Sequence, residues 1–590
     1  MNTDLQSYEE IWPARLLHVP SMTSFEWEPD NVYGGIEEPK FAVFSYTWGR
    51  WEVPWSGGAS SLPIKNVPWK VPSIDPARFT VAQFERAIQR ATEKVDFLWL
   101  DVACIDQVDE AAKADQVGKQ AGIFMNASHK YVWLHGTPLA QLQSLTDGIM
   151  HLAARLSGDE THEVSFPGFP ELTHLVHYGA DPGSPAACIH EPEWLQAVAS
   201  TARAIVQDPW FSSLWTLQEC YLGRNATLLS QEAEPATRQG FGDHELDTLV
   251  NSFGEIETAV REWLAQLRRE RPAIRDAALH IAYLEDTLDA LSPLVCQAWD
   301  FQPLIYCAAS RRTASNPLDQ VYGIMQVFGL RLGKAAEPER DFTLVELQDQ
   351  FSLALLAADP VNSQYFVHEV EPAAGEAWRL SKRMRIPAFL DVIGVWSIPR
   401  CEIGPAGDAS PTTSSSIGDT GMGPVFQGQA CSMPEIMRFW AHLEPLVYEH
   451  ENLVVGNRIA VQCIALDASR EVATGMPAEL LTTEDDSFET QQRLAGELVR
   501  LFRPDDVMVF LLGDVAETNF GELYEMTAEE PEFVHKGSGE IIGSVGLIVR
   551  RTMMMECGPT WRRVGICVWP QFGPGSVDED PFQYVEAVLS

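Results

Sequence analysis

Phe41-Ala-Val-Phe-Ser-Tyr46 is an apolar run rich in β-forming residues, and it predicts a buried strand. The apolar residues between Val81 and Ala91 then recur at helical spacing, and Phe97-Leu-Trp-Leu100 predicts a second buried strand. Strands that are joined by helical crossovers form parallel sheets with helices on both faces. We therefore predict a doubly wound parallel α/β sheet in which these two strands are neighbours.

The same alternation of strand and helix continues to residue 229. A helix is predicted over 114–124 with Asp109 as its N-cap, and a third strand over 131–134. Two further helices, over 139–156 and 193–206, precede a fourth strand at 226–229. These elements predict an α/β domain at residues 30–230, which follows an N-terminal extension at residues 1–29.

The rest of the chain changes in character twice. Residues 240–400 have mainly helical patterns, and residues 403–424 are rich in Gly, Ser, Thr and Pro, which is typical of a flexible linker or loop. Residues 430–590 predict a smaller, β-rich α+β unit. Its strands are predicted at 454–466, 507–512, 541–549 and 564–569.

Composition excludes several classes of function. The 42 basic and 83 acidic residues give a net charge of −41, which would repel nucleic acid across most of the surface. No stretch of about 18 apolar residues predicts a membrane span, and the first residues do not resemble a signal peptide. The ten cysteines form no CxxC pair, which is typical of free thiols in a reducing compartment. We expect a soluble cytoplasmic protein that binds neither nucleic acid nor membranes.

The familiar catalytic and metal-binding motifs are missing. The sequence has no phosphate-binding loop, no GxSxG nucleophile turn and no HExxH helix. His174, His177, Cys188 and His190 are zinc-competent residue types, but their spacing matches no structural zinc motif, so we predict no metal. Cys104 follows a predicted strand without an adjacent histidine base, and we expect it to be a small buried hydrophobe.

Three segments together resemble the fungal heterokaryon-incompatibility (HET) family. They are Phe44-Ser-Tyr-Thr-Trp-Gly49, then Leu98-Trp-Leu-Asp-Val-Ala-Cys-Ile-Asp-Gln107, then the stretch from Trp210 to Glu219. A downstream stretch from Arg311 to Tyr322 is similar to a further segment often found in this family. The chain departs from the pattern at Asp106, where the family has Asn, and at Ser213, where it has Arg. Both departures make the region less positive and put any contact with a ligand phosphate in doubt.

Polar residues follow two neighbouring predicted strands. Tyr46, Trp48 and Gly49 come after the first strand, and Asp101 and Asp106 come after the second. Because open parallel sheets bind ligands at the carboxyl ends of their strands, these residues predict a substrate-binding crevice. The alternative is that the tryptophans belong to the core and that the aspartates cap loops.

HET domains resemble Toll/interleukin-receptor (TIR) domains, which share the flavodoxin-like doubly wound sheet. Catalytic TIR domains hydrolyse NAD through a Glu placed four residues after a Trp on a helix, and Trp215 and Glu219 have that spacing. The resemblance implies an NAD glycohydrolase with Glu219 as its catalytic residue, Trp215 as a substrate contact and NAD as substrate rather than cofactor. The alternative is an ordinary solvated glutamate, because Glu219 lies about 140° from the centre of the helix's apolar stripe.

The family resemblance also implies a biological role. HET proteins act in nonself recognition between fungal strains, in which contact between incompatible partners triggers programmed cell death. This implies a protein partner and self-assembly. The competing interpretation is a non-catalytic interaction module that signals by assembly, with the C-terminal region sensing a partner. Another alternative is a regulator that kept the fold for an unrelated task.

Overall fold

The structure is a computed structural model, and most of the chain is described by it. The described residues are 11–47, 60–156, 187–238, 242–269, 277–295, 302–381, 383–387, 395–405, 423–450, 463–477, 480, 488–517, 541–555, 558–570 and 581–590. Two compact units divide the chain. The N-terminal unit comprises residues 2–300 and 304–344, and the C-terminal unit comprises residue 1, residues 301–303 and residues 345–590.

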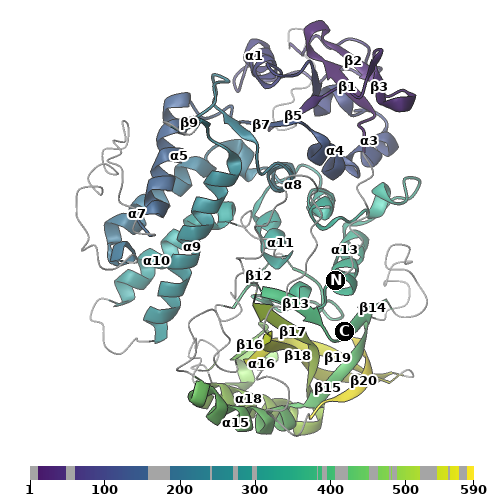
Figure 1. Ribbon diagram of the computed structural model, residues 1–590. Helices are drawn as coiled ribbons and strands as arrows, with labels where there is room; N and C mark the ends of the chain where they lie inside the picture. Colours follow the sequence, from purple (N-terminus) through teal and green to yellow (C-terminus); the bar gives the residue numbers. More distant parts are fainter. Residues whose placement is uncertain are drawn as a thin grey trace. The chain divides into compact units, whose positions relative to one another are not determined.

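A six-stranded sheet in the order β2-β1-β6-β5-β7-β8 forms the framework of the N-terminal unit (Figure 1). Its strands are β1 (Arg15–His18), β2 (Thr23–Glu26), β5 (Phe41–Ser45), β6 (Phe97–Trp99), β7 (His129–Trp133) and β8 (Thr227–Leu229). The strands β6, β5, β7 and β8 are parallel, and Val43 of β5 pairs with Trp99 of β6. The predicted parallel pairing of these two strands is therefore confirmed.

The sheet is mixed rather than wholly parallel, which corrects one part of the prediction. β1 pairs antiparallel with both β2 and β6, and it lies within the segment predicted as an N-terminal extension. Short strands of this kind are easily missed in a sequence, because four residues carry little periodic signal. Two small hairpins complete the strands of this unit. They are β3 (Val32–Tyr33) with β4 (Ile36–Glu37), and β9 (Thr237–Arg238) with β10 (Gly242–Asp243).

The helices near the sheet begin and end as their sequences dictate. Thr80 accepts a hydrogen bond from Gln83 and closes a capping box before α1 (Val81–Ala91), whose apolar face packs on β5 and β7. Asp109 caps α3 (Glu110–Val117) as predicted, by accepting from the backbone N–H of Ala112 at 3.1 Å. The helix predicted over 114–124 is divided into α3 and α4.

The helices from β6 to β8 are α2 (Asp101–Cys104), α3, α4 (Gln120–Asn126), α5 (Leu139–Ala154), α7 (Pro192–Val206) and α8 (Trp215–Leu222).

Long helices form a layer of their own in the N-terminal unit. The helices α5, α7, α9 (Leu246–Arg269) and α10 (Ala277–Val295) pack side by side (Figure 1). Their shared core includes Trp194 and Phe253, which are almost completely buried. Further along the chain lie the helices α11 (Gln302–Arg311), α12 (Asp319–Tyr322) and α13 (Leu344–Ala358). Short 3-10 turns occur throughout residues 1–344, and they are η1 (Val19–Ser21), η2 (Pro29–Asn31), η3 (Ala187–His190), η4 (Pro209–Ser212), η5 (Met325–Phe328) and η6 (Gly333–Ala335). The middle of the chain is helical as predicted as far as residue 358, but the end of the predicted range, residues 367–399, includes short strands.

The C-terminal unit is β-rich, as predicted. Its strands are β11 (Val367–His368), β12 (Met384–Arg385), β13 (Val395–Pro399), β14 (Glu402–Gly404), β15 (Val425–Ser432), β16 (Cys463–Leu466), β17 (Val507–Glu517), β18 (Ile541–Met555), β19 (Gly558–Pro570) and β20 (Gln583–Leu589). The pairings of β17, β18, β19, β20 and β15 close into a ring. Its helical elements are α15 (Met433–His450), α16 (Arg470–Gly475), α18 (Phe488–Phe502), η7 (Asn362–Gln364) and η10 (Pro504–Asp506). Residues 406–422 of the predicted linker lie outside the described residues.

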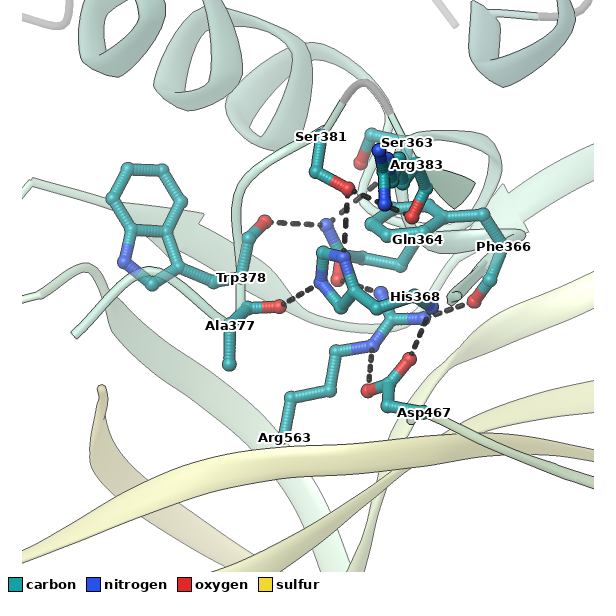
Figure 2. Close-up of polar contacts among 10 residues, drawn as sticks. All are labelled: Ser363, Gln364, Phe366, His368, Ala377, Trp378, Ser381, Arg383, Asp467 and Arg563. Atoms are coloured by element: carbon teal, nitrogen blue, oxygen red, sulfur yellow. Dashed lines mark hydrogen bonds and ion pairs between the residues drawn. The ribbon is translucent and has the colours of Figure 1, made fainter. Parts of the chain in front are cut away.

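A buried ion pair ties the parts of the C-terminal unit together (Figure 2). The guanidinium of Arg563 on β19 donates to the Asp467 carboxylate at 3.0 Å, and it also donates to Gln364 and to the Phe366 carbonyl. The second oxygen of Asp467 accepts from the backbone N–H of His368 at 2.8 Å. Because both charged groups are almost completely buried, each depends on the other for its solvation.

The unpaired charge left by removing one partner should destabilise the C-terminal unit strongly. Asp467→Ala should lower its free energy of unfolding by about 3–5 kcal/mol, because Arg563 remains buried without its carboxylate. Arg500→Ala, which removes the solvent-exposed pair with Glu497, is the matched control and should cost less than about 1 kcal/mol. Urea denaturation of the full chain measures the loss of unfolding free energy in each variant. Equal losses would contradict the central role of the buried pair.

Candidate functional site

The candidate site lies at the carboxyl edge of the parallel strands in the N-terminal unit. Ser45 ends β5, and Asp101 opens α2 directly after β6. Glu219 is on α8 and reaches the same edge, where its carboxylate contacts Ser45. Since β5 and β6 are neighbouring parallel strands, their carboxyl ends bring these residues together.

Ser45 holds one oxygen of the Glu219 carboxylate. Its hydroxyl donates to Glu219 Oε2 at 2.5 Å, and its oxygen accepts from the indole N–H of Trp210 at 2.7 Å. Because a hydroxyl has only one proton, the bond from Trp210 directs that proton toward Glu219. Trp210 itself is completely buried. The carboxylate is therefore bound to the central strand through a fixed donor.

Gln120 holds the other oxygen and is itself held by Gln218. Gln120 of α4 donates through Nε2 to Glu219 Oε1 at 3.3 Å, and its own Oε1 accepts from Gln218 at 2.8 Å. Both glutamine side chains are buried. Ser45, Gln120, Gln218 and Trp210 were not selected as site residues from the sequence, although Ser45, Trp210 and Gln218 lie inside the segments that carry the HET resemblance. Hydrogen bonds to residues far apart in the chain leave no periodic signal in a sequence.

The setting of Glu219 changes its ionisation. The pKa of the Glu219 carboxyl is raised to about 8, chiefly by burial and also by the negative charge of Asp101, although the hydrogen bonds from Ser45 and Gln120 lower it in part. The expectation of an ordinary exposed helical glutamate is wrong. The helical pattern of α8 identified one apolar stripe, but α4 and the strand edge also cover the side that carries Glu219.

Tyr46 and Asp101 form a second pair at this edge. The Tyr46 hydroxyl donates to Asp101 Oδ1 at 2.9 Å, and the backbone N–H of Val102 donates to the same oxygen at 2.7 Å. The Tyr46 ring packs against Phe84, with ring centroids 4.7 Å apart. Burial and the Asp101 charge raise the pKa of Tyr46 well above its usual value, so its hydroxyl remains a donor. Tyr46 therefore orients Asp101.

The remaining predicted substrate contacts fall in different places. Asp106 caps its own loop, because its Oδ1 accepts from the backbone N–H groups of Val108 and Asp109 at 2.8 and 3.0 Å. Its role as a substrate contact stays a prediction. Trp48 and Gly49 lie outside the described residues, so their predicted roles stay predictions as well.

A segment about a hundred residues downstream fixes the start of α8. The indole N–H of Trp215 donates to Asp319 Oδ2 at 3.1 Å. Arg312 donates to the Ser213 carbonyl at 3.0 Å and to the Thr216 hydroxyl at 3.2 Å. A parallel bridge between Ser213 and Thr313 adds backbone bonds. The resemblance identified the stretch from Arg311 to Tyr322, but its contact with Trp215 was not expected.

Other candidate chemistries find no support among the described residues. No group of three or more His, Cys, Asp or Glu side chains has a metal-binding arrangement in the part of the chain that the structure describes, and His174 and His177 lie outside it. Burial raises the pKa of the Cys104 thiol to about 12, so this cysteine is protonated at neutral pH, as expected for a small buried hydrophobe. Within the described residues, the helices are too short or too polar to cross a membrane.

The raised pKa of Glu219 predicts a pH-dependent stability. Between the ordinary value of 4.5 and about 8, the folded protein holds a proton on Glu219 that the unfolded chain loses. The contribution of this group to the free energy of unfolding therefore falls as pH rises through that window, by roughly 1–3 kcal/mol. Glu219→Gln should lose this dependence, as measured by urea denaturation of both proteins at each end of the window. Glu193→Gln, a change at an exposed position on α7, is the control, and a constant difference between wild type and Glu219→Gln would contradict the prediction.

Comparison with known proteins agrees with the resemblance. Residues 41–219 match the family model of the heterokaryon incompatibility protein (HET). Neither the curated proteins nor the solved structures contain a significant match to this chain. The matched range begins at β5 and ends at Glu219, so it includes both Ser45 and the carboxylate that it holds. The chain thus carries a HET domain at residues 41–219, which supports a role in heterokaryon incompatibility.

Proposed function

We propose that the HET domain hydrolyses NAD, with Glu219 as the catalytic carboxylate. The observation that carries this proposal is the setting of Glu219. Its carboxyl group is held at the carboxyl edge of the parallel strands, and burial raises its pKa to about 8. Strongly shifted carboxyl groups are concentrated at functional sites, and this edge is where doubly wound sheets bind ligands.

The reaction places a specific demand on this carboxylate. Hydrolysis of NAD breaks the bond between the nicotinamide nitrogen and the anomeric carbon of the ribose. The electron pair of that bond leaves with nicotinamide, and positive charge develops on the ribose, as in glycoside hydrolysis. The ionised Glu219 carboxylate stabilises this charge, and the water that adds to the anomeric carbon gives its proton to Glu219. Nicotinamide, ADP-ribose and one proton are the products.

The substrate's own charge assists the ionisation of Glu219. Burial favours the protonated carboxyl, whereas a bound pyridinium cation favours the carboxylate. Asp101 by itself opposes the ionisation of Glu219, because its negative charge raises that pKa, but the same charge attracts the cation whose binding favours the carboxylate. An oxidised dinucleotide therefore brings the charge that this site requires.

We assign roles to the other predicted contacts as well. Trp215 is half-buried, and we assign it to the nicotinamide ring, with its indole oriented by Asp319. Tyr46 holds Asp101, and we assign Asp101 and Trp48 to contacts with the substrate. Gly49 and Asp106 complete the proposed substrate contacts.

In the cell, this activity would deplete NAD and cause the death of incompatible fusion cells. The proposal includes a protein partner, self-assembly that completes the site, and a cytoplasmic location. The alternative is a non-catalytic module that signals by assembly. One observation favours it, because the bonds to Ser45 and Gln120 also give Glu219 a structural role in holding α8 against the sheet.

Substitution of the carboxylate tests the chemistry directly. Glu219→Gln keeps the side chain's shape but removes its charge, so nicotinamide release should fall by about two orders of magnitude or more. The assay follows nicotinamide released from NAD by the purified, concentrated full chain, and Glu193→Gln is the matched control.

A parallel measurement of NAD and viability in expressing cells separates the two functions. Equal release by wild type and Glu219→Gln would remove Glu219 from the mechanism. Cell killing without any loss of NAD would favour the interaction module.

Removal of Asp319 should weaken substrate positioning without touching the reacting atoms. Asp319→Ala loses the acceptor of the Trp215 N–H, a bond worth about 1 kcal/mol, so we expect KM for NAD to rise about fivefold and kcat to fall less. Asp319→Asn keeps an acceptor oxygen and should restore the wild-type KM. If Asp319→Asn is as impaired as Asp319→Ala, the hydrogen bond is not the cause.

A further inference from the structure

A cavity of about 290 Å³ lies in the helical layer of the N-terminal unit, separate from Glu219. Among the described residues, it lies between α9, α10 and the start of α7. Its lining includes His190, Pro192, Trp263, Leu267, His280 and Tyr283. The volume is near the lower end of the range of about 300–1,000 Å³ for small-molecule sites. It is therefore suited to a molecule of one or two rings.

Aromatic rings dominate the lining. The His190 ring meets the Trp263 ring edge to face, with centroids 4.2 Å apart and an interplanar angle of 80°. The rings of His190 and His280 are nearly parallel, at 17°, with centroids 6.4 Å apart. Tyr283 adds a fourth ring to the lining. Rings at both orientations offer a flat ligand its preferred offset-stacked and edge-to-face contacts.

The described lining has no acidic side chain and no Lys or Arg, in a chain with a net charge of −41. Burial, together with the neighbouring His190, lowers the pKa of His280, so its imidazole is neutral at neutral pH. An ionic ligand would lose its hydration here without gaining a partner. The cavity therefore favours an uncharged molecule.

Two ring nitrogens of the lining have no hydrogen-bond partner in the part of the chain that the structure describes. One ring nitrogen of His280 donates a hydrogen bond to the Ile189 carbonyl, so that nitrogen carries the proton of the neutral ring. The other ring nitrogen, Nε2, is then a hydrogen-bond acceptor. His280 Nε2 and Trp263 Nε1 are buried and have no hydrogen-bond partner among the described residues. Buried polar groups are normally satisfied. A ligand with one donor and one acceptor would satisfy both.

We propose that this cavity is a binding site for an uncharged planar heteroaromatic or phenolic molecule that carries an N–H or O–H donor. The rings supply stacking surface, and His280 Nε2 accepts the ligand's hydrogen bond. The site is independent of NAD hydrolysis, because none of its residues contacts Glu219, Ser45 or Asp101 in the described contacts.

Indole is the simplest probe, because it supplies the uncharged planar ring and the N–H donor for His280 Nε2, and its binding to the full chain is measured by titration calorimetry and ligand-observed NMR. Two further probes each lack one required property. Cyclohexanol has a donor but no aromatic ring, and indole-3-carboxylate has the ring but also a negative charge. We expect saturable indole binding, with each of the other two at least about tenfold weaker, which corresponds to about 1.4 kcal/mol. Failure of indole to bind, or equal binding of the three, would overturn the proposal.

Two variants locate the binding. Leu279 is also part of the lining but is 61% exposed, so Leu279→Trp should narrow the cavity without disturbing the core and weaken indole binding about tenfold or more. His280→Phe keeps a ring but removes the acceptor, so it should weaken the binding of indole by about fivefold, the loss of one hydrogen bond. Val108→Trp, at a position 75% exposed elsewhere in the same unit, is the matched control and should bind as wild type. Wild-type affinity in Leu279→Trp would place indole elsewhere and overturn the site.

Discussion

The hydrogen bond from Ser45 to Glu219 is the interaction on which the candidate site depends. It joins the end of the central strand to α8, two elements separated by more than 170 residues, and the indole of Trp210 fixes its direction. Burial on both faces makes β5 a rigid support, because helices cover a parallel sheet on either side. A carboxylate on such a support is preorganised, and its geometry does not have to be assembled when a ligand arrives.

The site extends beyond the range that matches the HET family. The match ends at Glu219, yet the N-terminal unit continues to residue 344 and supplies Arg312 and Asp319 to the start of α8. These bonds hold the backbone around Ser213 and the ring of Trp215, so they anchor the start of the helix that carries Glu219. The functional unit is thus larger than the matched segment. A shortened protein that ended near residue 230 would lose these anchors.

Burial, rather than the large negative charge of the whole chain, sets the protonation of the groups at both candidate sites. Desolvation raises the pKa of Glu219 and lowers that of His280, which keeps both groups neutral near pH 7. The effect on chemistry differs between them. The neutral form of Glu219 is poised to ionise when a cation binds, whereas neutral His280 presents a lone pair to an uncharged ligand. Surface charges at a distance are screened by salt and contribute little to either.

Local patterns in the sequence determined the parallel pairing of β5 with β6, the helical middle of the chain and the β-rich C-terminal unit, because runs of apolar residues and their periodicity are local signals. They also identified Glu219 and Trp215 through the family resemblance. They did not reveal the antiparallel β1, because its four residues are too few to show a period. They also did not reveal the burial of Glu219, because the apolar stripe of one helix does not show which other elements cover its remaining sides. Tertiary structure alone decided that Ser45, Gln120 and Asp319 contact the residues of α8, because hydrogen bonds between distant segments depend on how the elements pack and leave no spacing in the sequence.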